Sequence, residues 1–384
     1  MSVEERLKAE LEGRLPEMLG LLERVVRQNS YTANKSGGDA VGAMFSEEAA
    51  RLGLSVTTRE SERFANHLVF STPDVGSGFV TLVGHVDTVF PLGTFEVFER
   101  EGDILRGPGT LDMKGGIVVM LAALGALRRV GEKPNVKVVL VGDEEVGSPE
   151  GRGFIEEHAQ GSSAALVFEA GRAEDKIITR RKGTGSLKVR AEGKAAHAAN
   201  GHKDGINAIW AMAHFITRAQ SITNYELGTT VNVGVVRGGE AKNTVPDACE
   251  AEVDFRFTTV AEAENAEAAL FAAARAAEEL VPGARVTWTG GKGRLPLERT
   301  DASARLFERY AEDAKRAGLG FAEAGLIAGG SDASTTSAMG IPSIDGLGPR
   351  GAGFHTKEEH IIVSSLLPKT LALAAFIARA TDLP

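Results

Sequence analysis

The sequence contains a single cysteine, Cys249, and no apolar run long enough to cross a membrane. One cysteine cannot form an internal disulfide or build a thiolate metal cluster. Cys249 lies in the segment ACEAEVDFRF, which favours packing in a core. Because a membrane helix needs roughly 18 consecutive apolar residues, we expect no membrane partner. The charged N-terminal segment lacks the apolar stretch of a secretory signal, so we expect a cytoplasmic protein.

Excess positive charge is also missing. The 384 residues include 43 lysines and arginines against 52 aspartates and glutamates, which gives a net charge of −9. A nucleic-acid surface needs a basic stripe that replaces counterions, so no nucleic-acid partner is expected. The phosphate-binding pattern GxxxxGK[ST] and the serine-nucleophile pattern GxSxG do not occur. Their absence argues against a nucleotide-dependent enzyme and against a serine hydrolase.

The sequence does have enough apolar residues, 43%, and enough length for two domains. Apolar strand patterns at 79–83, 136–141 and 164–171 alternate with helical patterns at 3–28 and 115–131. Apolar strands separated by helices are typical of a parallel sheet that is covered on both faces. This part of the chain therefore predicts an α/β fold with a mostly parallel sheet.

The pattern changes in the middle of the chain, where the order becomes β-α-β-β-α-β. That order is typical of a ferredoxin-like α+β unit, so we expect an inserted domain over 182–294. The flanking parts, 1–181 and 295–384, would form one catalytic domain. The elements expected in the insert are strands 186–193, 229–236, 249–257 and 284–290 and helices 205–220 and 260–280. The elements expected after it are helices 302–317, 331–340 and from Ser364, and strands 320–325 and 342–348.

Acids and histidines follow the ends of the predicted strands. In open α/β sheets, ligands bind just outside the carboxyl ends of the strands. Carboxylates and imidazoles without thiolates suit zinc, manganese or cobalt, often as a pair of ions bridged by a carboxylate. The candidates are His85 and Asp87 after one strand, Glu144 and Glu145 after the next, Glu169 in the third, Asp112 in a glycine-rich loop, and the distant His355.

Each of these candidates also has a plainer interpretation. Asp112 could be only the N-cap of the helix at 115–131. The segments GHVD and GDEE could be solvated turns, and His355 a loop histidine. The joint pattern, with acids at successive strand ends and histidines at both ends of the set, favours a metal site.

Six motifs then appear in one order: GHVDTVFP, GPGTLDMKGG, GDEEVGS, KAAHA, GGEAKNTVPD and GGSDA. With them the chain resembles the dinuclear zinc exopeptidases and amidohydrolases, over nearly its whole length. That family includes carboxypeptidase G (glutamate carboxypeptidase), acetylornithine deacetylase and succinyl-diaminopimelate desuccinylase, and the resemblance is strongest to the carboxypeptidase G type. It implies a zinc exopeptidase-like catalytic domain and an inserted lid and dimerisation domain.

The resemblance also implies roles for the candidate residues. Two Zn²⁺ ions are expected, with Co²⁺ or Mn²⁺ as alternatives, and a water held between them as the nucleophile. The peptide bond between Asp112 and Met113 is expected to be cis. The implied roles are His85 on one metal and His355 on the other, Asp112 as the bridge, Glu145 and Glu169 completing one site each, Asp87 behind His85, and Glu144 as the general base.

The two adjacent glutamates are expected to have different functions. A carboxylate that touches the water without touching a metal can take its proton and pass it to the leaving amine. Consecutive side chains on an extended or turning backbone point in different directions, so one short segment can supply a ligand and a base. Glu145 is thus expected to bind metal and Glu144 to move the proton.

Residues of the insert are implied to contact the substrate. By the resemblance, His197 reaches the active site of a partner subunit and stabilises the oxyanion, so a homodimer through the lid is expected. Asn243 would bind the substrate from the lid, and Arg256 would hold the substrate carboxylate, which a planar guanidinium pairs with bidentately. Arg294 and Gly330 are weaker candidates for the same pocket.

These observations predict a two-metal hydrolase for an amide bond next to a free carboxylate. The expected substrate is a small peptide, from which a C-terminal amino acid such as glutamate is released. An N-acyl amino acid deacylase of the acetylornithine or succinyl-diaminopimelate type shares the metal core and stays open. A catalytically silent binding protein is disfavoured, because such a protein needs neither a base nor an oxyanion donor.

Overall fold

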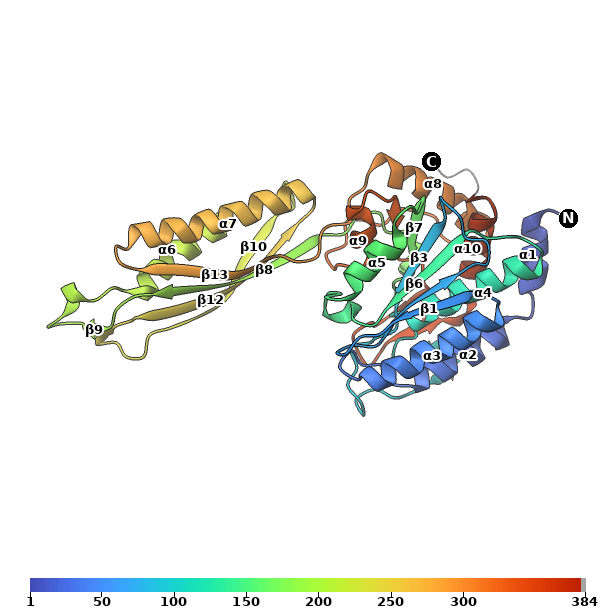
Figure 1. Cartoon of the computed structure of the whole chain (residues 1–384), viewed down its shortest axis with the longest axis horizontal. Coiled ribbons are helices and arrows are strands. Elements are labelled where there is room, and N and C mark those ends of the chain that lie inside the picture. The colour runs from blue at the N-terminus through green and yellow to red at the C-terminus, as the bar shows by residue number, and fades with distance from the viewer. Residues whose placement is uncertain (381–384) are drawn as a thin grey trace. The chain divides into compact units, whose positions relative to one another are not determined.

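The computed structural model describes residues 1–380, which divide into two compact units (Figure 1). Unit 1 comprises Met1–Arg180, Arg299–Ile327 and the described chain from Ser331 onward. Unit 2 comprises Arg181–Glu298 with the short return segment Ala328–Gly330. Each unit has its own cluster of buried apolar side chains.

Unit 1 is built on a six-stranded sheet with the order β1-β2-β6-β3-β7-β14. The four strands from β6 to β14 are parallel, whereas β2 runs antiparallel to β6 and β1 antiparallel to β2. The central strands are almost fully buried and rich in valine and leucine, as expected for strands covered on both faces. The predicted mostly parallel sheet is confirmed. The strands are β1 (Ser55–Arg59), β2 (His67–Ser71), β3 (Val80–His85), β6 (Val136–Val141), β7 (Ala164–Val167) and β14 (Ser343–Ile344).

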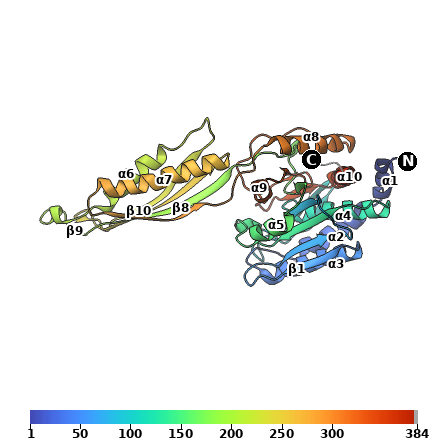
Figure 2. The ribbon, with the colours of Figure 1, turned by 45° about the horizontal axis from the view of Figure 1, so that its top comes forward.

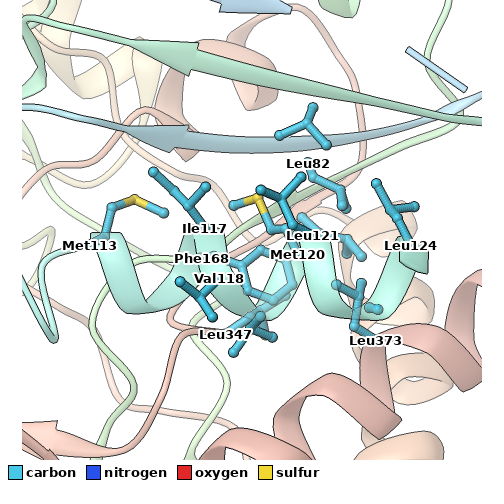
Figure 3. Close-up of a cluster of buried hydrophobic side chains, with 14 of the residues drawn as sticks. Leu82, Met113, Ile117, Val118, Met120, Leu121, Leu124, Phe168, Leu347 and Leu373 are labelled. Atoms are coloured by element: carbon cyan, nitrogen blue, oxygen red, sulfur yellow. The ribbon is translucent and has the colours of Figure 1, made fainter. Parts of the chain in front are cut away.

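The helices of unit 1 pack on this sheet and on one another. The most deeply buried is α4 (Lys114–Arg129), which lies between the sheet and α10, with Leu82 on one side and Leu373 on the other (Figure 3). Its glycines and small apolar residues allow close packing on both sides. The other helices are α1 (Val3–Leu11), α2 (Leu15–Arg27), α3 (Lys35–Arg51), α5 (Gly151–Ala159), α8 (Asp301–Arg316), α9 (Ala333–Ala338) and α10 (Leu366–Ala378).

Two local predictions for unit 1 are wrong. The helix predicted over 3–28 is broken into α1 and α2, because Gly13 has a φ of 83° and Pro16 lies in the first turn of the second helix. The strand predicted at 320–325 does not form, and this segment makes only a single bridge, between Glu323 and Ile177. It therefore follows the surface as irregular chain.

A second, smaller sheet of unit 1 has the order β15-β16-β5-β4. It pairs His360 with Arg106 and Ile361 with Leu105, so the end of the chain lies beside the segment that leads to the glycine-rich loop. The strands are β4 (Glu99–Glu101), β5 (Ile104–Arg106), β15 (Gly351–Ala352) and β16 (His360–Ile362).

Unit 2 has the predicted ferredoxin-like arrangement. Its four strands are all antiparallel in the order β10-β12-β8-β13, and α6 and α7 lie side by side on one face of the sheet (Figures 1 and 2). A two-stranded ribbon, β9 with β11, extends this unit. The elements are β8 (Gly183–Glu192), β9 (Ala196–His197), α6 (Ala208–Gln220), β10 (Thr230–Gly238), β11 (Thr244–Val245), β12 (Ala248–Phe257), α7 (Val260–Leu280) and β13 (Arg285–Lys292).

Among the described helices, none combines the length and the apolar character that a membrane span requires.

Candidate metal centre

His85 and three glutamates of the candidate centre lie at or just after the ends of three parallel strands of unit 1. His85 is the last residue of β3 and pairs in register with Val141, the last residue of β6. The short 3₁₀ turn η1 (Glu144–Val146) follows β6, and Glu169 follows β7 by two residues. Because the carboxyl ends of these neighbouring strands meet at one edge of the sheet, their side chains gather there.

The glycine-rich loop before α4 brings Asp112 to the same place. The peptide bond between Asp112 and Met113 is cis, as the resemblance predicted. Met113 is fully buried against β3, where a Cβ atom on Gly84 would lie 2.6 Å from its Cε. Gly84, which directly precedes His85, thus leaves room for Met113, which directly follows Asp112.

Asp112 lies between the two histidines. Its Oδ1 is 3.3 Å from His85 Nε2 and its Oδ2 is 3.3 Å from His355 Nε2. Glu169 Oε1 is 3.8 Å from His85 Nε2, and Glu145 Oε2 is 3.2 Å from His355 Nε2. Each histidine therefore has Asp112 and one of the two glutamates beside it. Grouped by mutual distance, one set of possible ligands is His85, Asp112 and Glu145, and the other is His85, Glu144 and Glu169. Carboxylate oxygens of Glu144 and Glu169 also lie within 4.8 Å of His85.

His355 reaches this cluster from the loop after β15. Its φ of 62° is in the left-handed region, which non-glycine residues adopt uncommonly. Its side chain is half-exposed, whereas His85 is buried. The two candidate metal positions therefore differ in their access to solvent.

Crowded carboxylates shift the proton affinities of the cluster. Contacts with Asp112 and Glu145 raise the pKa of His355 to about 10. Burial alone would lower the pKa of His85, but contacts with Asp112 and Asp87 raise it well above its ordinary value. Burial, and then the charge of Asp112, raise the pKa of Glu169 well above its usual range. The negative charge of the clustered carboxylates thus strongly favours the binding of protons or cations.

This residue set fits divalent metal ions. His85 Nε2 and Asp112 Oδ1 are buried and have no hydrogen-bond partner among the residues that the structure describes, although they face each other. Buried polar atoms are normally paired, so two facing lone-pair donors fit a cation bound between them. Imidazole and carboxylate are ligands of zinc, manganese and cobalt.

Asp87 connects His85 to the turn that carries both glutamates. Its carboxylate is buried and accepts the backbone N–H groups of Glu144 and Glu145, each at 3.2 Å. His85 Nδ1 is 3.0 Å from the backbone carbonyl of Asp87 and 3.4 Å from its Oδ1, so the nearer acceptor is the carbonyl. The hydroxyl of Thr32 also donates to this carboxylate, at 2.8 Å. Sequence reasoning missed Thr32, for which no motif gave a signal.

Glu359 is a second residue that sequence reasoning missed. Its fully buried Oε1 accepts the backbone N–H of Leu111 at 2.9 Å and that of Asp112 at 3.0 Å. Burial, and then the nearby charge of Asp112, raise the pKa of Glu359 to about 8. This carboxylate holds the loop that presents Asp112. The only signal in the sequence was an acid four residues after His355.

The remaining candidates lie in unit 2. His197 and Asn243 meet on the ribbon, where Thr244 pairs with His197 and the N–H of Ala198 donates to the carbonyl of Asn243 at 2.9 Å. His197 is exposed, and its Nδ1 accepts the backbone N–H groups of Ala199 and Asn200, each at 3.2 Å. Its Nε2 therefore carries the proton in the neutral ring and is a donor.

The two arginines of unit 2 are in different surroundings. Arg256 forms a bidentate pair with Asp254 of its own strand, with both N–O distances at 2.8 Å. Arg294 is buried, and its side chain packs over Gly330, where a Cβ atom would lie 2.6 Å from Arg294 Cδ. Arg294 and Gly330 are thus neighbours, whereas Arg256 already binds a carboxylate of the protein.

The chain belongs to the peptidase family M20/M25/M40, which matches residues 81–379. It is accordingly a metallo-peptidase, a hydrolase.

Its relatives include carboxypeptidase G2 of Pseudomonas sp. (strain RS-16), to which it is 29% identical over 370 residues, or 94% of this chain and 88% of that protein. Its fold is similar to that of aminopeptidase PepT from Bacillus cereus ATCC 10987, with a TM-score of 0.81, 19% identity and coverage of 96% and 99% of the two chains. A similar fold also occurs in the M20 family metallo-carboxypeptidase Sso-CP2 from Sulfolobus solfataricus, with a TM-score of 0.70, 17% identity and coverage of 95% and 99%.

Proposed function

We propose that this protein is a carboxypeptidase G-like exopeptidase. It hydrolyses an amide bond next to a free carboxylate and releases a C-terminal amino acid such as glutamate. The observation that carries the proposal is Asp112, with one carboxylate oxygen 3.3 Å from each of the two histidines. The sequence relationship to carboxypeptidase G2 supports this choice within the family.

In this proposal the five ligands hold two divalent ions. Zinc is the expected metal, and cobalt and manganese are alternatives. His85, Asp112 and Glu169 hold one ion, and His355, Asp112 and Glu145 hold the other. The ions supply Lewis-acid activation of water and of the amide carbonyl. Asp87 keeps the ring of His85 in the tautomer whose Nε2 lone pair is available, since Nδ1–H is directed at the backbone carbonyl of Asp87.

Glu144 is the general base of the proposal. Its carboxylate groups with His85 and Glu169 as a possible ligand set. In this proposal Asp112 supplies the third ligand there instead, and Glu144 transfers the proton. It accepts a proton from water and passes it to the leaving amine nitrogen, a transfer that typically contributes roughly 10²–10⁴-fold. In the homodimer that we propose below, His197 of the partner subunit donates from Nε2 to the carbonyl oxygen as charge develops there.

The variants Glu144→Gln and Glu145→Gln test whether Glu144 is the base and Glu145 a metal ligand. Glu144→Gln is expected to keep both metal equivalents and lose roughly 10²-fold or more in kcat. Glu145→Gln is expected to lose about one metal equivalent. Metal content is measured on the purified variants by plasma mass spectrometry, together with turnover of N-acyl-glutamate. Equal metal loss in both variants would remove the distinction between ligand and base.

Two further measurements test the substrate and the assembly. A screen of N-acyl amino acids and dipeptides with added zinc is expected to favour substrates with a free terminal carboxylate. Faster turnover of acetylornithine or succinyl-diaminopimelate would assign the deacylase function instead. We also propose a homodimer through unit 2, which the exposed Ile209 and Trp210 on α6 support. A monomeric mass by light scattering at full activity would exclude a role for His197 in a partner's site.

A further inference from the structure

The loop that carries His355 is held by polar contacts rather than by burial. Residues 354–358 are all exposed, and the pairing of β15 with β16 that this loop closes extends over only two residue pairs. At His355 the φ of 62° costs free energy, because the side chain crowds the backbone in this region. Such a conformation persists only where neighbouring contacts hold it.

Bonds within the loop fix the shape of its turn. The N–H and the hydroxyl of Thr356 both donate to the carbonyl of Gly353, at 3.0 and 2.7 Å. The N–H of Glu358 donates to the hydroxyl oxygen of Thr356 at 3.2 Å. These bonds join near neighbours in the chain, so they do not fix where the turn lies relative to the other metal ligands.

Arg106 binds this loop from the neighbouring strand. It is the last residue of β5 and pairs with His360 of β16. Its Nε and Nη2 both donate to the backbone carbonyl of Lys357, at 3.0 and 2.8 Å, and Nη2 is also 3.2 Å from Glu358 Oε1. These two residues follow His355 by two and three positions, so Arg106 holds the loop directly beside the imidazole.

The guanidinium of Arg106 is itself fixed on its other sides. Its Cζ is 5.8 Å from the centroid of the Phe95 ring, within the range of a cation–π contact, and its Nη1 is 3.7 Å from Glu99 Oε2 on β4. A planar fork that is held in this way has a defined direction. Because β5 leads directly into the glycine-rich loop that ends in Asp112, Arg106 connects the segments of Asp112 and His355.

We propose that Arg106 is a positioning residue for the ion that His355 binds, and that this ion alone binds weakly without it. The inference rests on the proposed assignment of this ion to His355, Asp112 and Glu145. A positive side chain near a cation would by itself weaken the binding of that cation by repulsion. Positioning and charge therefore act in opposite directions, and only positioning makes the removal of Arg106 weaken metal binding.

Competition titrations of the metal-free enzyme with a chromophoric chelator measure the affinity of each zinc equivalent. Two equivalents are expected in the wild type. Arg106→Met is expected to weaken one equivalent roughly 10- to 100-fold, as is typical for groups that orient a metal ligand, and to leave the other unchanged. Arg106→Lys keeps the charge without the planar fork, so an intermediate loss is expected. His355→Ala is expected to lose the same equivalent, and adding Arg106→Met to it is expected to cause no further loss.

Arg100→Met is the matched control. Arg100 lies on β4 of the same small sheet, and its Nε donates to the backbone carbonyl of Gly102 at 3.0 Å, in the turn between β4 and β5. This substitution removes the same charge and a bond to a carbonyl, but that bond does not involve the loop of His355. Both zinc equivalents are therefore expected to keep their wild-type affinity.

The possible results separate this inference from the proposed function. Equal weakening of both equivalents in Arg106→Met, unchanged or tighter binding, or the same loss in Arg100→Met would overturn the inference and leave the hydrolase proposal intact. A wild type that binds two ions but hydrolyses no N-acyl amino acid or dipeptide would overturn the proposed function alone. A wild type that binds at most one ion would overturn both.

Discussion

The substitution Asp87→Asn tests how one buried carboxylate organises the whole centre. The carboxylate accepts the Thr32 hydroxyl and the N–H groups of Glu144 and Glu145, and it lies 3.4 Å from His85 Nδ1. Asparagine keeps the shape, but its amide nitrogen cannot accept a hydrogen bond. At least one part-buried N–H of the turn therefore loses its acceptor.

The magnitude follows from the number of lost contacts. One unsatisfied buried donor costs about 1–3 kcal/mol in the free energy of unfolding. The carboxylate also holds the turn that carries the proposed ligand Glu145, and loss of a group that supports a metal ligand typically weakens metal affinity about 10- to 100-fold. Asp87→Asn is therefore expected to show both losses. The assays are urea unfolding of the metal-free protein and competition for zinc with a chelator.

Thr32→Val is the matched control for Asp87→Asn. It removes one donor to the carboxylate and leaves both backbone N–H groups with their acceptor. We expect a cost of about 1 kcal/mol in the free energy of unfolding and almost unchanged zinc affinity. The same zinc affinity in Asp87→Asn and Thr32→Val would refute the reasoning, because the bonds to the turn would then have no effect on the metal ligands.

Two other predictions concern packing and buried charge. Gly84→Ala places a Cβ 2.6 Å from Met113 Cε. The free energy of unfolding is therefore expected to fall by about 1–3 kcal/mol, and zinc binding is expected to weaken. An unchanged free energy of unfolding would contradict this prediction. Burial lowers the pKa of Lys369 to about 8, partly offset by Asp175, from 10.5 in the unfolded chain. The unfolded state therefore binds more protons between about pH 8 and 10.5, and stability rises with pH in that window. The free energy of unfolding of the wild type relative to Lys369→Met should rise by about 2 kcal/mol from pH 7.5 to 10, and parallel urea-unfolding profiles would contradict it.

The sequence was sufficient for the parts of the site that depend on strand order. Parallel strands place their carboxyl ends at one edge, so His85, Glu144, Glu145 and Glu169 could be grouped from apolar runs alone. The ferredoxin-like unit could be predicted for the same reason, because its strands and helices alternate with clear periodicity. His355 needed the family resemblance, since no local pattern connects it to the strand ends.

Other features depend on tertiary contacts that leave no local trace. Thr32, Glu359 and the fit of Met113 against Gly84 are visible only once the chain is folded. The strand expected at 320–325 failed for the opposite reason, because a short apolar segment found no neighbouring strand to complete a ladder. The break in the helix over 3–28 could have been predicted, since Gly13 and Pro16 are ordinary helix-ending signals.

The small sheet β15-β16-β5-β4 has a consequence for how the protein is made. It joins segments 251 residues apart, as in the hydrogen bond from Arg106 to the carbonyl of Lys357. On the ribosome, the acids of the first 180 residues are complete long before His355 emerges. Unit 2 has its own core and lies between the two segments that this sheet joins. Once unit 2 has folded, the chain between these segments is effectively shorter, so less loop-closure entropy is lost when they pair. In the proposed assignment the second ion needs His355, so only a chain that has been synthesised past this residue can bind both ions.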